Sequence, residues 1–289
     1  MKRIDFKTTN TLAEELLTQG LVTKLEKKSF FSNLFSTKEF ADIYFYNGSQ
    51  LDKETIEKIK KAKVVIVNSK VAKEQVFAQT QIDDSKIKII YPSINTQYRK
   101  PKVVKEEFIK KHNLNKKKKI ILFTAKNLKS SGVKEFIDLM ISLTVDNFQI
   151  IIAGEKTQVY SLKFQISKYN FGDKLLLLED YEDMDELFLA SDIFILPTYN
   201  KNFASNILKA MFCKCAVFIT KNNAASEMID VFSKMESPTD RSMQFKVDAL
   251  LQNKDDLKLI KKQNRKIAKE YTLENNLKKF DEILSRLDS

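Results

Sequence analysis

The polar loop at residues 198–205 holds the groups of this chain that are best placed to do chemistry. It follows the apolar run Ile193–Leu196, which predicts a strand covered on both faces, and Pro197, which cannot donate to a sheet and so ends that strand. A helix is predicted at 206–212. Three backbone N–H groups come at its start, where phosphate groups bind, and they belong to Asn202, Phe203 and Ala204.

The elements around this loop follow a repeating strand–helix order. Runs rich in apolar residues predict strands at 43–46, 64–67, 87–90, 119–124, 148–153, 174–178, 193–196 and 216–220. Helical spacing of apolar residues predicts helices between them, one or two helices at 11–35, and further helices at 226–233, 239–252, 254–270 and 273–287. The apolar segment 29–35 is expected to be buried. Strands that alternate with helices indicate an α/β fold with parallel sheets.

Length and composition indicate two modest domains. A chain of 289 residues, 43% hydrophobic and 30% charged, suits two α/β cores. No stretch reaches the about 18 apolar residues of a membrane span, and the first residues show no secretory signal, so we expect a cytoplasmic protein. We expect Cys213 and Cys215 to be buried structural thiols, because the single histidine, His112, lies far away in the sequence.

The net charge of +12 is concentrated in one short segment. Residues 99–119 carry 10 basic and 2 acidic side chains, whereas residues 120–289 carry 24 of each. A basic cluster of this kind binds anionic lipid headgroups or a phosphorylated ligand, or it is a solvated linker. Nucleic acid is not expected as a partner, because the segment has one phenylalanine and one arginine, Arg99, and lies in no recognised binding module.

From residue 64 onward, the chain resembles the family 4 (group 1) retaining glycosyltransferases. The motifs stand in the family's order: VVIVNSKVAKEQV, IIYPSINTQYRKP, ILFTAKNLKSSGVKEFIDL, FQIIIAG, SDIFILPT, ILKAM and NNAASEMI. The resemblance implies the GT-B fold, with two Rossmann-like parallel-sheet domains of which the first is truncated here. It also implies a nucleotide-sugar substrate and a reaction that uses no cofactor and no metal.

The resemblance assigns donor-binding positions, and several carry residues that the family does not have there. The family's two glutamates, eight residues apart, contact the donor sugar and the ribose, and here these positions are Lys201 and Lys209. A lysine can bind phosphate oxygens, but it cannot accept a hydrogen bond from a sugar hydroxyl. The family's arginine and lysine for the diphosphate correspond to Lys126 and Ser131.

Two more residues complete the predicted donor site. Lys129 lies close enough in sequence to replace the charge that Ser131 lacks, and Glu227 matches a family position but could equally cap its own helix. The four lysines at 126, 129, 201 and 209 form a new anion site, or they are solvated residues at a site that no longer works. In the first case, a phosphate-bearing ligand would relieve their mutual repulsion and stabilise the protein.

These observations divide the chain into a reduced acceptor-side α/β domain at 1–98, a basic interdomain segment at 99–119, a donor-binding Rossmann-like domain at 120–271 and a helix at 272–289 that packs back on the first domain. We expect a glycosyltransferase that moves a sugar to a cell-surface glycan or lipid-linked acceptor, as in lipopolysaccharide or capsule biosynthesis, at the inner membrane face. The alternative is a catalytically inactive scaffold or binding subunit of an envelope-associated complex. No catalytic base is predicted.

Overall fold

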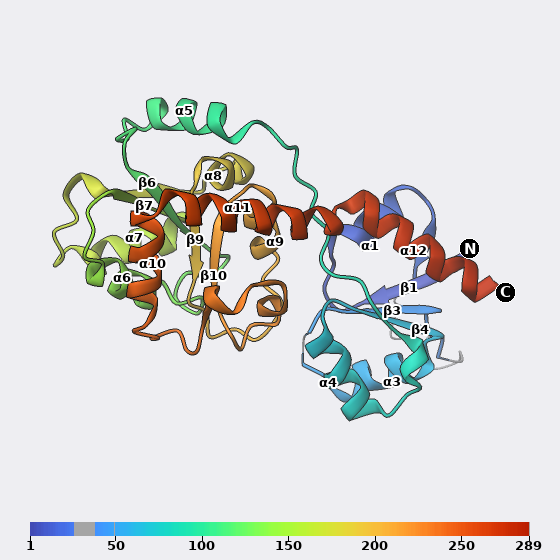
Figure 1. The fold of residues 1–289 in the computed structure, drawn as a ribbon. Coiled ribbons are helices and arrows are strands. Elements are labelled where there is room, and N and C mark those ends of the chain that lie inside the picture. The colour runs from blue at the N-terminus through green and yellow to red at the C-terminus, as the bar shows by residue number, and fades with distance from the viewer. Residues whose placement is uncertain (26–37, 49, 289) are drawn as a thin grey trace. The chain divides into compact units, whose positions relative to one another are not determined.

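The computed structural model describes residues 1–25, 38–48 and 50–288, and it divides into two compact units. The first comprises Met1–Asn95 with Tyr271–Ser289, and the second comprises Thr96–Glu270. Each unit has its own parallel sheet with helices around it (Figure 1), which confirms the predicted α/β class. The apolar segment 29–35, predicted to be buried, lies outside the described residues.

The sheet of the first unit has five parallel strands, in the order β2-β1-β3-β4-β5. They are β1 (Lys2–Phe6), β2 (Val22–Lys24), β3 (Ile43–Tyr46), β4 (Val64–Val67) and β5 (Ile87–Ile89). Both faces are buried, because alternate residues of β3 join different cores: Ile43 and Phe45 pack in one cluster, and Tyr44 and Tyr46 in the other.

In the described part of the first unit, two pairs of helices cover this sheet. On one face lie α1 (Thr11–Thr18) and α12 (Leu273–Asp288), which pack against each other; on the other lie α3 (Lys53–Lys61) and α4 (Lys70–Thr80). A short turn of helix, η1 (Asp84–Lys86), precedes β5. Phe280 of α12 is fully buried, with its ring 6.0 Å from that of Phe45. The last helix of the chain therefore completes the core of the first unit.

The prediction of one or two helices at 11–35 is wrong for residues 19–25, and residues 26–35 lie outside the described residues. Helix α1 ends at Thr18, Gly20 adopts a left-handed φ of 65°, and the chain continues as β2, parallel to β1. Leu21, an apolar residue within the predicted helical stretch, is 40% exposed. Strand β1 was not predicted, because its sequence KRIDF carries three charged residues and only its alternate positions face a core.

The sheet of the second unit has six parallel strands, in the order β11-β10-β9-β6-β7-β8. They are β6 (Lys119–Thr124), β7 (Phe148–Gly154), β8 (Leu175–Glu179), β9 (Ile193–Leu196), β10 (Ala216–Thr220) and β11 (Lys234–Met235). All eight strands predicted for the two units are present to within one residue at each end. The unpredicted β11 is two residues long and pairs only with the end of β10.

Seven helices of the second unit surround this sheet in the described part of the chain. They are α5 (Pro101–Lys111), α6 (Val133–Ser142), α7 (Lys156–Ile166), α8 (Met184–Ala190), α9 (Asn206–Phe212), α10 (Met243–Gln252) and α11 (Lys254–Ala268). The helix predicted at 226–233 is wrong: this stretch forms two short 3-10 turns, η3 (Ala224–Met228) and η4 (Val231–Ser233). Further 3-10 turns are η2 (Gly172–Lys174) and η5 (Lys269–Tyr271). Residues 239–242 precede α10 as a turn.

The basic segment 99–119 belongs to the second unit, where α5 packs on α8. Lys105 of α5 pairs with Asp192, which is only 5% exposed and also binds Lys261 of α11 at 2.8 Å and the N–H of Ile120 at 3.0 Å. Burial disfavours the charged carboxylate, but the two ammonium groups outweigh it and lower the pKa of Asp192. Burial lowers the pKa of Lys105.

The two cysteines are buried free thiols, as predicted. Burial raises the pKa of Cys213 to about 12, so its sulfur is a thiol at neutral pH. Cys215 donates to the carbonyl of Phe188 at 3.1 Å. Within residues 1–25, 38–48 and 50–288, no helix is both long enough and apolar enough to cross a lipid bilayer.

Candidate functional site

The strand order of the second sheet has a reversal between β6 and β9. Chain order runs outward from β6 through β7 to β8, and then from β9 through β10 to β11 on the other side. The direction of winding reverses between β6 and β9, which are paired as parallel neighbours, so their carboxyl ends lie side by side. Ligands of open parallel sheets bind at such a reversal, at the carboxyl ends of the strands. Residues 125–132 and 197–205 form the two loops.

The two loops approach each other closely at Gly132. A Cβ atom on this glycine would lie 1.9 Å from the carbonyl oxygen of Pro197, and the residue has a φ of 86°. Only glycine fits a position with both constraints. A second contact lies beside it, where the hydroxyl of Tyr199 donates to Glu135 of α6 at 2.9 Å. The geometry therefore brings the predicted residues of both loops to one edge of the sheet.

The loop 125–132 is held from behind by Gln158 of α7. The side-chain oxygen of Gln158 accepts from the N–H of Leu128 at 2.7 Å, and its nitrogen donates to the carbonyl of Lys126 at 3.0 Å. Leu128 is buried against Gly154, whereas the side chains of Lys126 and Lys129 are exposed. Gln158 was not predicted, because nothing in its local sequence distinguishes it from a surface residue.

Ser131 completes this loop as a half-buried residue whose N–H donates to the carbonyl of Asn127 at 3.2 Å. Asn127 also accepts from the N–H and the hydroxyl of Ser130. Neither Lys126 nor Lys129 forms an ion pair with a described residue. The loop thus presents two cationic side chains on a fixed backbone.

The loop 198–205 is organised by Asn223, which is 1% exposed. Its side-chain oxygen accepts from the N–H groups of Ala204 (3.2 Å) and Ala225 (3.0 Å), and its nitrogen donates to the carbonyls of Asn200 (2.8 Å) and Asn202 (2.7 Å). All the hydrogen-bonding capacity of this amide is used. An asparagine immediately before a helical turn such as η3 is a sequence signal for a capping residue. Its bonds to the loop 198–205 join segments about 20 residues apart, so local sequence does not predict them.

Two of the three backbone amides that were predicted to bind phosphate donate to side chains of the protein in this structure. The N–H of Asn202 donates to the side chain of Asn200 at 2.9 Å, and that of Ala204 donates to Asn223. Both donors are already satisfied within the protein. Phe203 is half-buried between them. Helix α9, which follows, has seven residues and starts without a side-chain cap.

The two motif lysines have different surroundings. The side chain of Lys201 is exposed and forms no ion pair with a described residue, while its carbonyl accepts from the N–H of Ala224. The ammonium group of Lys209 instead lies 2.7 Å from a carboxylate oxygen of Asp185, on α8. Asp185 was not predicted as a partner. Glu227 is half-buried in η3, next to Ser226, whose hydroxyl donates to the carbonyl of Lys221.

Comparison with known proteins identifies the family of the second unit. The family model described as "Glycosyl transferases group 1" matches residues 104–269. An N,N'-diacetylbacillosaminyl-diphospho-undecaprenol alpha-1,3-N-acetylgalactosaminyltransferase of Campylobacter jejuni is 32% identical over 127 residues, which is 43% of this chain and 32% of that protein. The lipopolysaccharide core biosynthesis mannosyltransferase LpsB of Rhizobium meliloti is 26% identical over 49% of this chain and 42% of its own length. The matches thus span less than half of each relative.

Solved structures share the fold of the whole chain at low sequence identity. HepE of Anabaena, crystallised with UDP-glucose, matches with a TM-score of 0.74 and 14% identity over 99% of this chain and 100% of its own. A glycosyltransferase of Rickettsia africae matches with a TM-score of 0.73 and 16% identity, over 97% and 88%. WaaG, a glycosyltransferase involved in lipopolysaccharide biosynthesis, matches with a TM-score of 0.69 and 12% identity, over 97% and 98%. With a family match over more than half of its length, this chain has the GT-B fold and belongs to the group 1 glycosyl transferases.

Proposed function

We propose that this protein transfers a sugar, with retention at the anomeric carbon, from a nucleotide sugar to a lipid-linked or cell-surface glycan acceptor. Binding of the nucleotide-sugar donor is supported by the exposed ammonium groups of Lys126 and Lys129, which lie on the loop fixed at the end of β6. HepE was crystallised with UDP and with UDP-glucose, which supports a nucleotide-sugar donor here. The names of the two relatives support a glycan or diphospho-lipid acceptor.

Each part of the site would act through charge and position. Lys126 and Lys129 would bind the oxygens of the donor diphosphate, and their charge would stabilise the diphosphate as it leaves the sugar. Lys201, on the facing loop, would add a third cation near the same group. Ser131 would contribute a hydroxyl, and Phe203 and Glu227 would shape the end of the site. Because these lysines have no acidic partner among the described residues, a bound diphosphate would reduce their repulsion.

Titration calorimetry with UDP, GDP and inorganic diphosphate tests the donor site. We expect one nucleoside diphosphate to bind, and we expect the double variant Lys126→Ala/Lys129→Ala to bind it at least tenfold more weakly. Lys258→Ala is the matched control, because Lys258 is an exposed lysine of α11 without an ion pair to any described residue. No binding of any of the three ligands by the wild type, at millimolar concentration, would disprove the donor site.

A second function, that of a non-catalytic glycosyltransferase-like binding subunit, is favoured by two specific observations. Lys209 stands where the resemblance places a carboxylate, and it is already paired with Asp185. The amides of Asn202 and Ala204 are satisfied internally. A binding subunit would keep nucleotide affinity without turnover. Release of UDP from UDP-sugars, with and without a polyprenyl diphosphosugar acceptor, separates the two functions, since only a transferase accelerates release when acceptor is added.

The basic segment supports contact with an anionic membrane surface as part of this function. Of its ten cations, Arg99, Lys105 and Lys111 form ion pairs within the second unit. The other seven form no ion pair with a described residue; they are Lys100, Lys102, Lys110, Lys116, Lys117, Lys118 and Lys119. We expect binding to phosphatidylglycerol vesicles that is lost at raised salt and weakened by Lys116→Glu/Lys117→Glu, and no binding to phosphatidylcholine vesicles.

A further inference from the structure

A groove on the surface of the second unit lies along α11. Its lining comes from α11, from the residue that follows this helix and from the turn that follows α9. Helices α9 and α11 pack against each other (Figure 1). The cavity volume is about 520 Å³, which is within the range of about 300–1,000 Å³ that is usual for small-molecule sites.

The groove lies at the opposite edge of the second sheet from the candidate donor loops. Helix α9 runs from the carboxyl end of β9 to the amino end of β10, and Lys214 lies in the turn between α9 and β10. The loop 198–205 instead follows the carboxyl end of β9. Strand β10 has five residues, which extend over about 15 Å. A ligand in the groove therefore binds at a distance from a donor held by these loops.

The lining of the groove is strongly cationic. None of the lining residues in the described part of the chain is acidic, and five are basic, namely Lys214, Lys262, Arg265, Lys266 and Lys269. The acidic residues of α11 lie in its first turn, and residues 257–268 contain none. The helix dipole places about −0.5 of a charge at the end of α11, which is small beside five cations. Lys214, Lys262 and Lys266 form no ion pair with a described residue.

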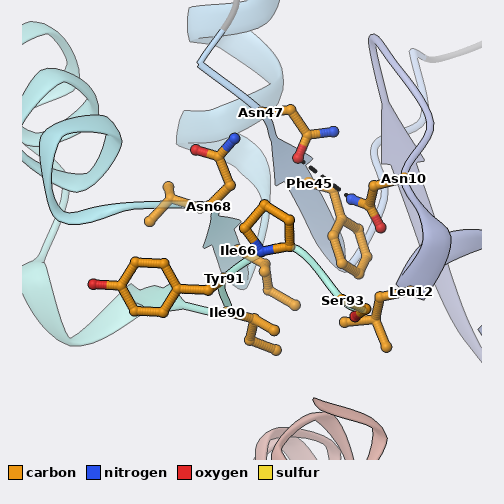
Figure 2. Close-up of a pocket in the computed structure, with 11 residues that line it drawn as sticks. Asn10, Leu12, Phe45, Asn47, Ile66, Asn68, Ile90, Tyr91 and Ser93 are labelled. Carbon is orange, nitrogen blue, oxygen red and sulfur yellow. Dashed lines mark hydrogen bonds between the residues drawn. The ribbon is translucent and has the colours of Figure 1, made fainter. Parts of the chain in front are cut away.

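A pocket of the first unit has the opposite composition. Figure 2 shows that its polar side chains include Asn10, Asn47 and Asn68, and no described residue of its lining is acidic or basic. An uncharged lining does not select for the charge of a ligand. The cations of the groove along α11 repel one another until an anion binds, so this groove selects an anion.

Arg265 is held in the groove before any ligand binds. Its guanidinium carbon lies 3.5 Å from the centroid of the Tyr98 ring and 4.6 Å from that of Phe212, and its side chain donates to the carbonyl of Phe212. The other donors of this guanidinium bond to no described residue. A planar fork that is already fixed binds two oxygens of one phosphate with little further loss of side-chain entropy.

Lys214 places a cation in the groove although its backbone conformation suits glycine. Its φ of 65° lies in the left-handed region, where a Cβ atom is unfavourable. Its N–H donates to the carbonyl of Met211 at 3.1 Å, a turn that glycine forms without strain. Strained residues of this kind cluster at functional sites. The strain at Lys214 is therefore a second observation, independent of the charge count, that indicates a ligand at this groove.

We propose that this groove binds an anion that carries two or more phosphate groups in a chain, separately from the donor loops. From Lys262 to Lys269 the chain rises by about 10 Å, so several linked phosphates neutralise the two ends better than one phosphate does. Arg265 lies between these lysines. Leu259, which is 53% exposed, offers an apolar surface to the organic part of the ligand. The proposal does not rest on the transferase activity.

Titration calorimetry with inorganic triphosphate, at physiological ionic strength, tests the groove. The chain used carries Lys126→Ala/Lys129→Ala, so that the donor loops do not compete for the ligand. We expect triphosphate to bind this background variant, and we expect at least tenfold weaker binding after the further substitution Lys214→Gly. Because Lys214→Gly relieves backbone strain, a loss of binding does not come from a damaged fold, and thermal unfolding checks this.

Two further double substitutions in the same background separate the groove from the general charge of α11. Lys262→Ala/Lys266→Ala removes two lysines of the groove and should weaken triphosphate binding at least tenfold. Lys254→Ala/Lys258→Ala is the matched control, because it removes two exposed lysines of the same helix that do not line the groove. We expect the control to bind within twofold of the background variant.

Three outcomes overturn the proposal: triphosphate does not bind the background variant, the groove variants bind it unchanged, or the control weakens binding as much as they do. UDP separates this site from the donor site. Binding of UDP that is lost in Lys126→Ala/Lys129→Ala and unchanged in Lys214→Gly supports two sites. If UDP does not bind while triphosphate still occupies the groove, the donor site is disproved and the present proposal stands.

Competition identifies the source of the phosphate chain. We expect ADP, a soluble molecule with two linked phosphates, to displace triphosphate from the groove. Displacement by phosphatidylcholine vesicles that carry a diphosphorylated lipid, and not by ADP, would assign the site to a lipid headgroup. Displacement by neither competitor would contradict a site for linked phosphates.

Discussion

The ammonium group of Lys209 lies 2.7 Å from the carboxylate of Asp185, and the two side chains are only 29% and 23% exposed. This ion pair joins α9 to α8 within the second unit, and the hydroxyl of Thr96 donates to the same carboxylate at 3.3 Å. Of the two lysines at the motif positions, Lys209 therefore has a structural partner, while Lys201 is exposed.

Asp185→Asn leaves the half-buried ammonium group of Lys209 without a counter-ion. We expect the free energy of unfolding to fall by about 1–2 kcal/mol, because a partly buried charge loses its partner. Denaturant unfolding of Asp185→Asn, Lys209→Gln and the double variant measures the coupling. Asp185→Asn would tighten the binding of UDP if the released ammonium group of Lys209 could reach the phosphates. We expect the affinity for UDP to be unchanged.

Asp192→Asn removes the carboxylate shared by Lys105 and Lys261, and we expect a loss of about 3 kcal/mol in stability because two half-buried cations lose their partner. The pKa of Asp192 is lowered in the folded protein. Its contribution to stability is therefore complete above the ordinary carboxyl pKa, near 4, and is lost as the pH falls below it.

Urea unfolding between pH 3 and pH 7 measures this dependence. The difference in stability between the wild type and Asp192→Asn should shrink as the pH is lowered from about 5. Asp138→Asn, at an exposed aspartate of α6, should show no such difference. A difference that stays constant down to pH 3 would contradict an ionised Asp192 as the source of the stability.

Asn223→Ala removes four hydrogen bonds that connect the loop 198–205 to η3. We expect a loss of about 2–4 kcal/mol, since buried backbone groups are left unsatisfied. Amide hydrogen exchange at Ala204 and Ala225 should become faster than in the wild type. The neighbouring exposed Asn222→Ala is the control, and equal protection in both variants would show that Asn223 does not organise the loop.

Lys214→Gly should stabilise the protein. Lys214 follows α9 with a left-handed φ of 65°, and its N–H donates to the carbonyl of Met211. A side chain in this conformation costs about 1–2 kcal/mol, and glycine loses roughly 0.5–1 kcal/mol in unfolded-state entropy, so we expect a net gain of about 0.5–1 kcal/mol. Lys214→Ala keeps the Cβ atom and should not stabilise. Thermal unfolding of the two variants decides between them.

Local sequence was sufficient for the strands of both sheets that are buried on both faces. Runs such as Val64–Val67 and Ala216–Thr220 have no polar break, and the hydrophobic effect gives such a run one stable place, inside a sheet covered by helices. Within each sheet, the loops that follow the strands lie at one edge, because all strands of that sheet are parallel. The sequence therefore predicted which loops lie at the carboxyl edge of the second sheet, and the donor site at these loops stays a prediction.

Local sequence failed where a residue's role depends on a partner far along the chain. Strand β1 exists because β2 and β3 flank it, and Leu21 follows a helical pattern without being helical. The truncation of the first domain, the transferase activity and its alternative, an inactive scaffold, stay predictions.

Sequence by itself determined the strands that are formed by runs rich in apolar residues, since the burial of such a run follows from its polarity. Tertiary structure decided which charges and amides are paired. Asp185 and Lys209 are 24 residues apart, and Asp192 and Lys261 are 69 apart. The sequence does not distinguish a lysine whose ammonium group pairs with a carboxylate from one whose ammonium group is solvated. Only the packing of α8, α9 and α11 brings the carboxylates within reach, and the strength of an ion pair depends on that distance and on burial.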